Sequence, residues 1–273
     1  MKHGYESKDM SFQLKGMKAV VTGGSSGIGL ATVELLVAER AYVAWCGRNE
    51  ERLEASKALI LERYPYAQVF TQTCNVLDKN DVEHFAQQVE AQFGGIDILI
   101  NNAGQGRVSN FDNTEDQAWL DEVELKYFSV LNPIKACLPA LKRSTCASIT
   151  NVNSLLALQP EPHMIATSAA RAALLNLTHS LAHEFTQYQI RVNSILLGMV
   201  ESEQWRRRFA ARSDQTQSWE TWIGKIAQER GIPMARLGKP EEPARALVFL
   251  ASPLASYTTG STLDVSGGFN KHL

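Results

Sequence analysis

Three closely spaced glycines near the start of the chain could hold the phosphates of a nucleotide. Gly23, Gly27 and Gly29 lie in the sequence VVTGGSSGIGLA, between an apolar run and a helix-patterned segment. Glycine permits a sharp turn at the first position, close approach of a pyrophosphate at the second, and tight packing of helix on sheet at the third. Free N–H groups and the dipole at the helix start then favour phosphate. The pattern predicts a dinucleotide site, with an ordinary Gly-Ser loop as the alternative.

The end of the second strand-like run indicates which dinucleotide this is. The run closes on Gly47, where an acidic side chain would bind the ribose 2′-hydroxyl of NAD, and Arg48 follows. A guanidinium can pair with the 2′-phosphate of NADP, and no carboxylate is present to repel that phosphate. The alternative is that Arg48 is a solvated side chain and Asn49 caps the next helix. The charge argument favours NADP(H) over NAD(H).

Strand and helix signals alternate along the chain and position these residues. We expect strands at 18–21, 41–46, 68–74, 96–100, 147–152, 191–196 and 262–265, and helices at 27–38, 50–63, 79–93, 115–141, 163–186, 202–229 and 241–252. This alternation implies right-handed βαβ crossovers, a mostly parallel sheet and helices on both faces. Ligands bind such sheets beyond the carboxyl ends of the strands. We predict a single domain from residue 15 to residue 273, after a flexible extension of residues 1–14.

Composition excludes several classes of function. Of the 273 residues, 44% are hydrophobic and 21% are charged, as in an ordinary soluble globular protein. A net charge of −2 provides no basic field for nucleic acid or a membrane surface, and no apolar run is long enough to span a bilayer. The polar start has no signal-peptide core, and the cysteines lack metal or disulfide spacing. We therefore expect a cytoplasmic protein with free thiols, no metal, and no nucleic-acid or membrane partner.

Two motifs together resemble the short-chain dehydrogenase/reductase family. They are TGGSSGIG in the glycine-rich turn and NNAG at Asn101–Gly104, and the likeness runs from about Lys15 to Phe269. The resemblance implies a doubly wound Rossmann fold whose seven strands lie in the order 3-2-1-4-5-6-7. It also implies a substrate lid at about residues 199–235, a small-molecule substrate, and assembly as a homotetramer or homodimer.

The same resemblance extends the cofactor site beyond the glycine-rich turn. Asn75 stands where the family has an adenine-contacting aspartate, an exchange that keeps a hydrogen-bond acceptor and adds a donor. Leu197 replaces the proline of a family Pro-Gly turn, whereas Gly198 keeps the turn itself. The residues expected to bind the cofactor are Gly23, Ser25, Ser26, Gly27, Ile28, Gly29, Arg48, Asn49, Asn75, Val76, Asn102, Ala103, Gly104, Arg171, Gly198, Val200 and Ser202.

The catalytic positions depart from the family pattern. Ser154 matches the family's serine at the end of a strand. Thr167 and Arg171 replace the tyrosine and lysine of Y-x-x-x-K, still one helical turn apart on one face. The fourth position, usually an asparagine seven residues after a tryptophan, is Lys126, and the nearest asparagine, Asn132, is nearly two turns away. We predict that Ser154, Thr167, Arg171 and Lys126 form the catalytic set.

Replacement of the tyrosine removes the usual proton donor. The pKa of a phenol is about 10, whereas a threonine hydroxyl is far less acidic, and Arg171 keeps its proton at working pH. Arg171 can still hold the nicotinamide ribose or an anionic substrate group. Lys126, His163 or Tyr127 could supply the proton instead. Each also has a structural interpretation, as an exposed lysine, a solvated loop histidine, and a core or interface tyrosine.

Two functions of different classes remain open. The first is an NADP-dependent oxidoreductase that interconverts a carbonyl or imine with an alcohol or amine. In that enzyme Ser154 orients the substrate, and Lys126, a water or the substrate itself manages the proton. The second is a catalytically impaired NADP(H)-binding sensor or assembly protein. The retained serine and the full lid favour the enzyme.

The expected lid combines apolar cover with positive charge. One of its arginines could bind a carboxylate or a phosphate-bearing carrier. The alternative is that the arginines form a solvated helix face. The residues concerned are Trp205, Phe209, Trp219 and Trp222, with Arg206, Arg207, Arg208 and Arg212.

Overall fold

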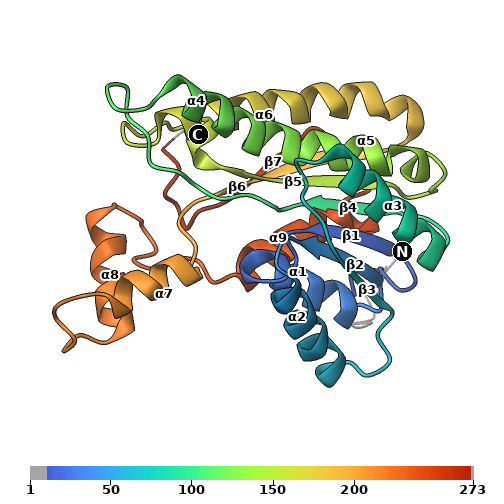
Figure 1. The fold of residues 1–273 in the computed structure, drawn as a ribbon, viewed down its shortest axis with the longest axis horizontal. Coiled ribbons are helices and arrows are strands. Elements are labelled where there is room, and N and C mark those ends of the chain that lie inside the picture. Colours follow the sequence, from blue (N-terminus) through green and yellow to red (C-terminus); the bar gives the residue numbers. More distant parts are fainter. Residues whose placement is uncertain (1–10, 272–273) are drawn as a thin grey trace, which may run out of the picture.

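Seven parallel strands form the centre of the molecule. The computed structural model describes residues 11–271, and its sheet has the order β3-β2-β1-β4-β5-β6-β7 (Figure 1). The strands are β1 (Lys18–Thr22), β2 (Tyr42–Gly47), β3 (Val69–Thr73), β4 (Ile98–Asn101), β5 (Ser148–Ser154), β6 (Arg191–Leu197) and β7 (Thr262–Val265). This order confirms the predicted doubly wound fold. It reverses between β1 and β4, so their carboxyl ends border the crevice where such sheets bind ligands.

Helices cover both faces because side chains alternate along each strand. Val20 of β1 belongs to one core and its neighbour Val21 to the other. Figure 1 shows the two helix layers on opposite sides of the sheet. One layer contains α3 (Lys79–Phe93), α4 (Asp116–Val123), α5 (Ser129–Leu141) and α6 (Ile165–Glu184), and the other contains α1 (Gly27–Ala38), α2 (Glu50–Arg63) and α9 (Glu241–Ala251).

A π-helical turn interrupts the segment predicted as one helix at 115–141. The turn, η1 (Glu124–Phe128), joins α4 directly to α5 and contains the buried Lys126. A π turn holds an extra residue, so it changes the direction of the side chains that follow it, and such turns concentrate at functional sites. Helical periodicity does not distinguish this turn from a regular one.

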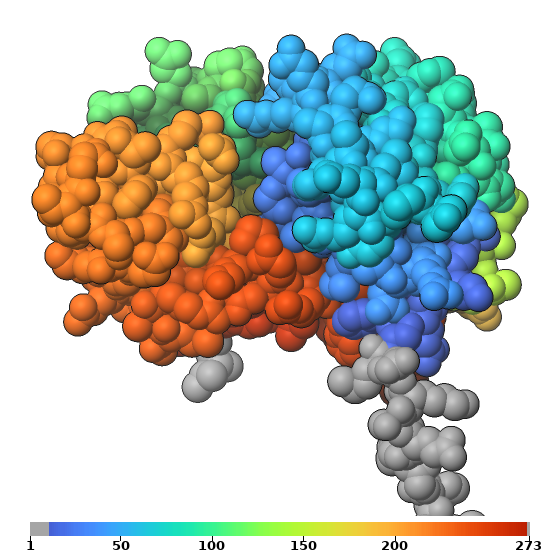
Figure 2. Space-filling view, turned by 90° about the horizontal axis from the view of Figure 1, so that it is seen from below, coloured from blue at the N-terminus to red at the C-terminus, as the bar shows by residue number. Residues whose placement is uncertain are grey.

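The segment predicted as one helix at 202–229 is broken into two. Between α7 (Glu203–Ala210) and α8 (Trp219–Glu229), the Asp214 carboxylate accepts the backbone N–H of Thr216, at 2.8 Å. The Ser218 hydroxyl then caps α8, so local hydrogen bonds end one helix and begin the next. Figures 1 and 2 show this segment, in orange, as a lobe beside the body.

The lobe is attached to the body by an apolar cluster. Trp219 and Ile223 of α8 pack with Leu155 and Leu196, which lie at the carboxyl ends of β5 and β6. The segment predicted as a lid therefore lies over the ligand-binding end of the sheet.

The packed domain begins before residue 15. Leu14 is fully buried, and the Ser11 hydroxyl and the Phe12 N–H both donate to the Glu39 carboxylate. Residues 11–14 therefore do not form a flexible extension as predicted, because their backbone and one apolar side chain are fixed to the body. The rest of the predicted extension, residues 1–10, and the last two residues lie outside the described range.

The close packing of Gly29 generates a test of this frame. A Cβ on Gly29 would lie 2.1 Å from the Gly23 carbonyl oxygen and 2.5 Å from Asn102 Nδ2. Gly29→Ala should therefore lower the free energy of unfolding by about 1–3 kcal/mol in urea titrations. Gly224→Ala is the matched control, since its Cβ would approach no atom closer than 3.9 Å. Equal stability of the two variants would contradict the packing role of Gly29.

Candidate active site

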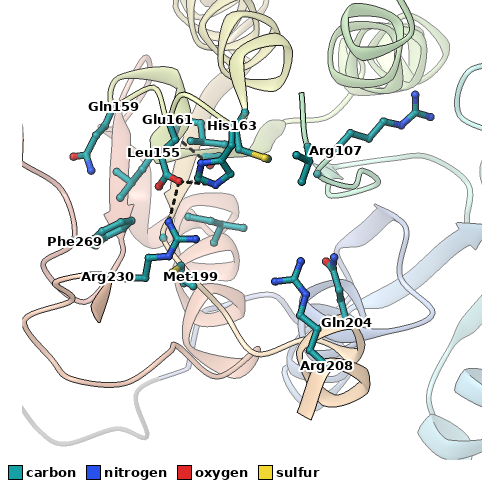
Figure 3. Close-up of a pocket in the computed structure, with 17 residues that line it drawn as sticks. Arg107, Leu155, Gln159, Glu161, His163, Met199, Gln204, Arg208, Arg230 and Phe269 are labelled. Carbon is teal, nitrogen blue, oxygen red and sulfur yellow. Dashed lines mark hydrogen bonds and ion pairs between the residues drawn. The ribbon is translucent and has the colours of Figure 1, made fainter. Parts of the chain in front are cut away.

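A cavity of about 300 Å³ opens beyond the carboxyl ends of β4, β5 and β6 (Figure 3). Its position is where open parallel sheets bind ligands. Ser154, the predicted catalytic serine, is part of its wall, together with residues of the lid. The lining residues are Gly106, Arg107, Val108, Ser154, Leu155, Leu156, Gln159, Glu161, His163, Met164, Leu197, Gly198, Met199, Gln204, Arg208, Arg230 and Phe269.

The glycine-rich turn has an open surface of backbone atoms. Gly23 and Gly27 have φ values of 67° and 54°, in the left-handed region that favours glycine. A Cβ on Gly27 would meet nothing within 4 Å. Ser26, at the N-cap of α1, makes no side-chain capping bond, whereas Ile28 packs against the core. The uncapped helix start and the open turn fit the phosphates of a dinucleotide.

The end of β2 presents one cation beside this turn. Arg48 is exposed and makes no ion pair with any residue from 11 to 271. Asn49 accepts the Arg52 N–H at 2.8 Å and so caps α2, which is its structural interpretation. A Cβ on Gly47 would lie 3.3 Å from Ser25 Oγ, so a hydroxyl of the turn borders this strand end. A phosphate group fits this combination of a cation and a hydroxyl.

Asn102 of the NNAG motif connects the carboxyl ends of β1 and β4. Its Nδ2 donates to the carbonyls of Thr22 and Gly23, at 3.1 Å and 3.0 Å. In return, the Thr22 hydroxyl accepts the N–H groups of Asn102 and Ala103. The glycine-rich turn after β1 and the NNAG loop after β4 are therefore fixed to each other by hydrogen bonds from side chains.

Asn132 supports the loop after β3 and does not lie beside the predicted catalytic residues. Its Nδ2 donates to the carbonyls of Val76 and Leu77, at 3.1 Å and 3.3 Å. The Asn75 side chain accepts the Leu77 N–H at 3.2 Å in the same loop. These contacts give Asn132 a structural role, and Lys126 stays the predicted residue at the fourth family position.

The loop after β6 is closely packed at its glycine. A Cβ on Gly198 would lie 2.7 Å from the Cβ of Ser266, so a larger residue does not fit without movement. Val200 pairs with Gly238 in an isolated bridge. Ser202 is exposed at the N-cap of α7 and makes no side-chain capping bond, which leaves its hydroxyl available to a ligand.

A buried carboxylate joins the residues at the unusual catalytic positions. Glu122 Oε2 accepts two hydrogen bonds, one from Lys126 Nζ at 3.0 Å and one from the Thr167 hydroxyl. The side chains of Glu122 and Lys126 are only 2% and 1% exposed. Arg107 Nε lies 3.6 Å from the other carboxylate oxygen. The structure therefore brings Lys126 and Thr167 together on one oxygen atom.

Glu122 was absent from the predicted site. It lies four residues before Lys126, so the two side chains share one face of the helix, at the spacing typical of ion pairs. This spacing was the available signal. The bond to Thr167 joins α4 to α6 across 45 residues of chain, and no local pattern contains it.

Burial changes the acidity of the two cations in this region. It lowers the pKa of Lys126 to about 8, and the positive charges of Arg171 and Arg107 act in the same direction. The hydrogen bond and charge of Glu122 oppose this fall. Burial also lowers the pKa of Arg171, to about 10, which leaves its guanidinium charged at neutral pH. Lys126 is therefore the cation that can exchange a proton near neutrality.

Arg171 lies between the cofactor loop and β5. Its Nη1 donates to the Val152 carbonyl at 2.8 Å, and a Cβ on Gly104 would lie 3.7 Å from its Nη2. Its Nε is buried and has no hydrogen-bond partner among the described residues. This donor next to the NNAG loop fits the hydroxyl groups of a ribose.

The hydroxyl groups of Thr167 and Ser154 differ in whether their hydrogen is free to bind a ligand. Thr167 has one hydroxyl hydrogen, and its strongest acceptor is the Glu122 carboxylate, with the Arg107 carbonyl 3.2 Å away. Ser154 Oγ accepts the Leu156 N–H at 3.3 Å, so its own hydrogen is available to the cavity. Ser154 can therefore donate directly to a ligand.

The two other proton-donor candidates lie outside the Glu122 cluster. His163 lines the cavity, where its Nε2 lies 3.1 Å from Glu161 Oε2, and its side chain is 46% exposed. The ring of Tyr127 packs edge-to-face on Phe128, with centroids 5.7 Å apart. His163 thus faces the cavity, whereas Tyr127 packs against a neighbouring aromatic ring, as its structural interpretation predicts.

Neither a metal cluster nor a membrane helix occurs between residues 11 and 271. No three His, Cys, Asp or Glu side chains in this range could hold a metal ion together. No helix in the same range is both long and apolar enough to cross a bilayer. All four cysteines are free, and Cys146 alone is exposed. Burial raises the pKa of Cys137 to about 12, so this thiol stays protonated.

Comparisons with known proteins agree with this geometry. A family model described as enoyl-(acyl carrier protein) reductase matches residues 23–270. The chain is 55% identical to a short-chain oxidoreductase from Pseudomonas aeruginosa PAO1, solved with NADPH and described as containing an atypical catalytic center. That match covers 94% of this chain and 98% of the other, with a TM-score of 0.91.

Two further proteins match over nearly their whole length. The L-sorbose reductase of Gluconobacter frateurii, solved with NADPH and L-sorbose, is 30% identical, with 97% of this chain and 100% of that chain covered and a TM-score of 0.91. The 3-oxoacyl-(acyl-carrier-protein) reductase FabG of Salmonella typhimurium is 35% identical over 259 residues, which are 95% of this chain and 98% of that protein.

The shared carboxylate generates a test of the cluster. Glu122→Gln removes the negative charge that holds the proton on Lys126, so the pKa of Lys126 should fall below about 8. The titration of Lys126 is followed by NMR of protein labelled at the lysine Cε. Asp121→Asn is the matched control, because Asp121 also pairs with Arg107 but is 41% exposed. An unchanged or raised pKa in Glu122→Gln would contradict the proposed contact.

Proposed function

Because the chain belongs to the short-chain dehydrogenase/reductase family, we propose that it transfers a hydride between NADP(H) and a small-molecule carbonyl or imine. The observation that carries this proposal is the hydrogen-bonded group of Lys126, Glu122 and Thr167 next to the cavity that contains Ser154. The group contains an exchangeable proton where the family's tyrosine is absent.

The cofactor would be held at both of its ends. Gly23, Gly27 and the uncapped start of α1 would receive the pyrophosphate, and Arg48 would pair with the 2′-phosphate. The small residues Ala103 and Gly104 would let the adenosine-side ribose approach the backbone, and Arg171 would hold the nicotinamide ribose. Backbone groups near Val200 and the Ser202 hydroxyl would bind the nicotinamide carboxamide. When bound, NADPH supplies the hydride. The exposed, unpaired guanidinium of Arg48 supports a preference for NADP(H) over NAD(H).

The proton would come from Lys126 through the two hydrogen bonds that Glu122 Oε2 accepts, one from Lys126 and one from Thr167. Ser154 donates a hydrogen bond that orients the substrate oxygen. As negative charge develops there, Thr167 would turn its hydroxyl from Glu122 toward that oxygen and give it the proton, while a proton from Lys126 would pass through Glu122 Oε2 to the Thr167 oxygen. Thr167 never has to ionise, so its low acidity is no obstacle. Lys126 ends neutral and regains a proton from solvent, consistent with a pKa of about 8.

A specific observation supports the second candidate, an NADP(H)-binding protein without turnover. Lys126 and Thr167 are 1% and 2% exposed, and the Thr167 hydroxyl is directed to Glu122. In that function the cluster would stabilise the fold beside the cofactor without passing a proton to a substrate.

Two further properties belong to this proposal. We infer a homotetramer or homodimer, because α4 and η1 expose Leu120, Val123 and Phe128 on one continuous segment. We also infer a cytoplasmic location, which the free thiols of Cys46, Cys74 and Cys137 support.

Lys126 distinguishes the two candidate functions. Lys126→Met should lower kcat at least about 100-fold, since it removes the proton source, while the Kd for NADPH changes little. Turnover is followed by NADPH absorbance with carbonyl, imine and acyl-thioester substrates, and the Kd by calorimetry. Lys135→Met, at an exposed position on α5, is the control. A wild-type protein that binds NADPH but turns over none of these substrates would favour the binding function instead.

Arg48 is the test of cofactor preference. Arg48→Gln should weaken NADPH binding about 10-fold to 100-fold, through loss of a charge-assisted contact, and should weaken NADH binding far less. Calorimetric titration with each cofactor measures both constants. Arg52→Gln, one helical turn further along α2, should bind both like the wild type. A parallel loss of NADPH and NADH affinity in Arg48→Gln would refute a specific phosphate contact.

A further inference from the structure

One arginine of the lid points its charge into the cavity. Arg208, on α7, lines the cavity, and Figure 3 shows its side chain extending toward the open space beside Gln204. Its guanidinium carbon lies 5.0 Å from the centre of the Trp205 ring. Among residues 11–271 its guanidinium pairs with no carboxylate and donates to no backbone carbonyl. Its charge is therefore free to bind a ligand.

The neighbouring arginines of the lid are already engaged. Arg206 pairs with Glu201 at 2.8 Å and lies 3.7 Å over the Trp219 ring. Arg212 donates to the Phe209 carbonyl at 2.8 Å. Arg207, which precedes Arg208 directly, does not line the cavity.

The other charges of the cavity wall are balanced by protein groups. Arg230 Nη1 lies 3.3 Å from Glu161 Oε2, the same oxygen that His163 contacts at 3.1 Å (Figure 3). Arg107 pairs with Asp121 and Glu122, each at 3.6 Å, and in Figure 3 its guanidinium points away from the cavity. Of the arginines in the wall, Arg208 is the one without a carboxylate partner among residues 11–271. One anionic group on the ligand would balance its charge.

Shape and lining limit what can carry that anionic group. Leu155, Met199 and Phe269 give the cavity an apolar floor, and the cavity measures about 300 Å³. The loop at Gly198 lines the same space, so the nicotinamide would occupy part of this volume and leave room for a small substrate only. Ser154 and Arg208 both border the space.

We infer that the substrate is a small oxo acid, whose carboxylate binds Arg208 while its carbonyl oxygen lies against Ser154. This inference rests on the proposed function. A guanidinium binds a carboxylate through two parallel N–H···O bonds, a geometry that also fixes orientation. In the reaction a hydride adds to the carbonyl carbon and a proton to its oxygen, and the carboxylate is unchanged. Because Arg208 lies on the lid, the acid would also fix the lid over the site.

The test compares acids with their uncharged esters. Pyruvate, acetoacetate and levulinate place a carboxylate at increasing distance from a ketone, and each is paired with its methyl ester. With NADPH, the wild type should show a kcat/KM at least about 10-fold higher for the best acid than for its ester. Arg208→Gln should bring this ratio close to one, mainly through KM for the acid. Arg207→Gln, the matched control on the same helix, should keep the wild-type ratio.

The outcomes separate this inference from the proposed function. Turnover without preference for any acid, or an acid preference that survives Arg208→Gln, overturns the oxo-acid assignment and leaves the reductase intact. If no substrate turns over, ligand-observed NMR of levulinate and methyl levulinate with the NADP⁺-bound protein decides. Binding of the acid that Arg208→Gln abolishes and Arg207→Gln keeps supports the acid site even then. Equal binding of acid and ester, or binding of neither, overturns it.

Discussion

The Glu122 carboxylate is the interaction on which the unusual site depends. Two cations for which burial is costly, Lys126 and Arg171, lie near this carboxylate, and the 43% exposed Arg107 also pairs with it. One carboxylate partly neutralises all three and also fixes the Thr167 hydroxyl. A phenol in place of Thr167 would fill this space with an aromatic ring. The shorter hydroxyl is therefore compatible with a charged, hydrogen-bonded group.

The frame that positions this group is a row of buried polar residues across four neighbouring strands. Thr22, Asn101, Asn151 and Ser194 occupy paired register positions across β1, β4, β5 and β6, and all are buried. Asn101 donates to the Asn151 side chain at 2.9 Å, and Ser194 donates to the Asn151 carbonyl at 3.1 Å. A shift of one strand would break these bonds and leave further buried groups unpaired, in addition to Asn101 Oδ1, which has no partner among the described residues. On β1 and β4 this row leads directly into the glycine-rich turn and the NNAG loop, and on β5 it lies three residues before Ser154.

Local chemistry explains which parts of the molecule could be predicted from the sequence. The glycine turn at Gly23–Gly29, the alternation of strands and helices, and the strand order all follow from short patterns or from a resemblance carried by short motifs. Ser154 and Lys126 were predicted from the resemblance to the family, at positions that match its motifs. Glu122 was missed because its role needs a contact between α4 and α6. The break between α7 and α8 was missed because Asp214 holds a turn and Ser218 begins α8 through bonds that periodicity does not contain. Leu14 was missed because a single apolar residue before a strand carries no periodic signal.

The aromatic composition of the lid has a consequence for spectroscopy. Of the five tryptophans in the chain, Trp205, Trp219 and Trp222 lie together in the lobe of α7 and α8. Arg206 lies 3.7 Å over the Trp219 ring, and a cation at that distance perturbs the excited state of an indole. Three of the five tryptophans therefore lie in the segment that covers the cavity. The lobe carries an intrinsic optical reporter of its own position, and no label has to be introduced to follow it.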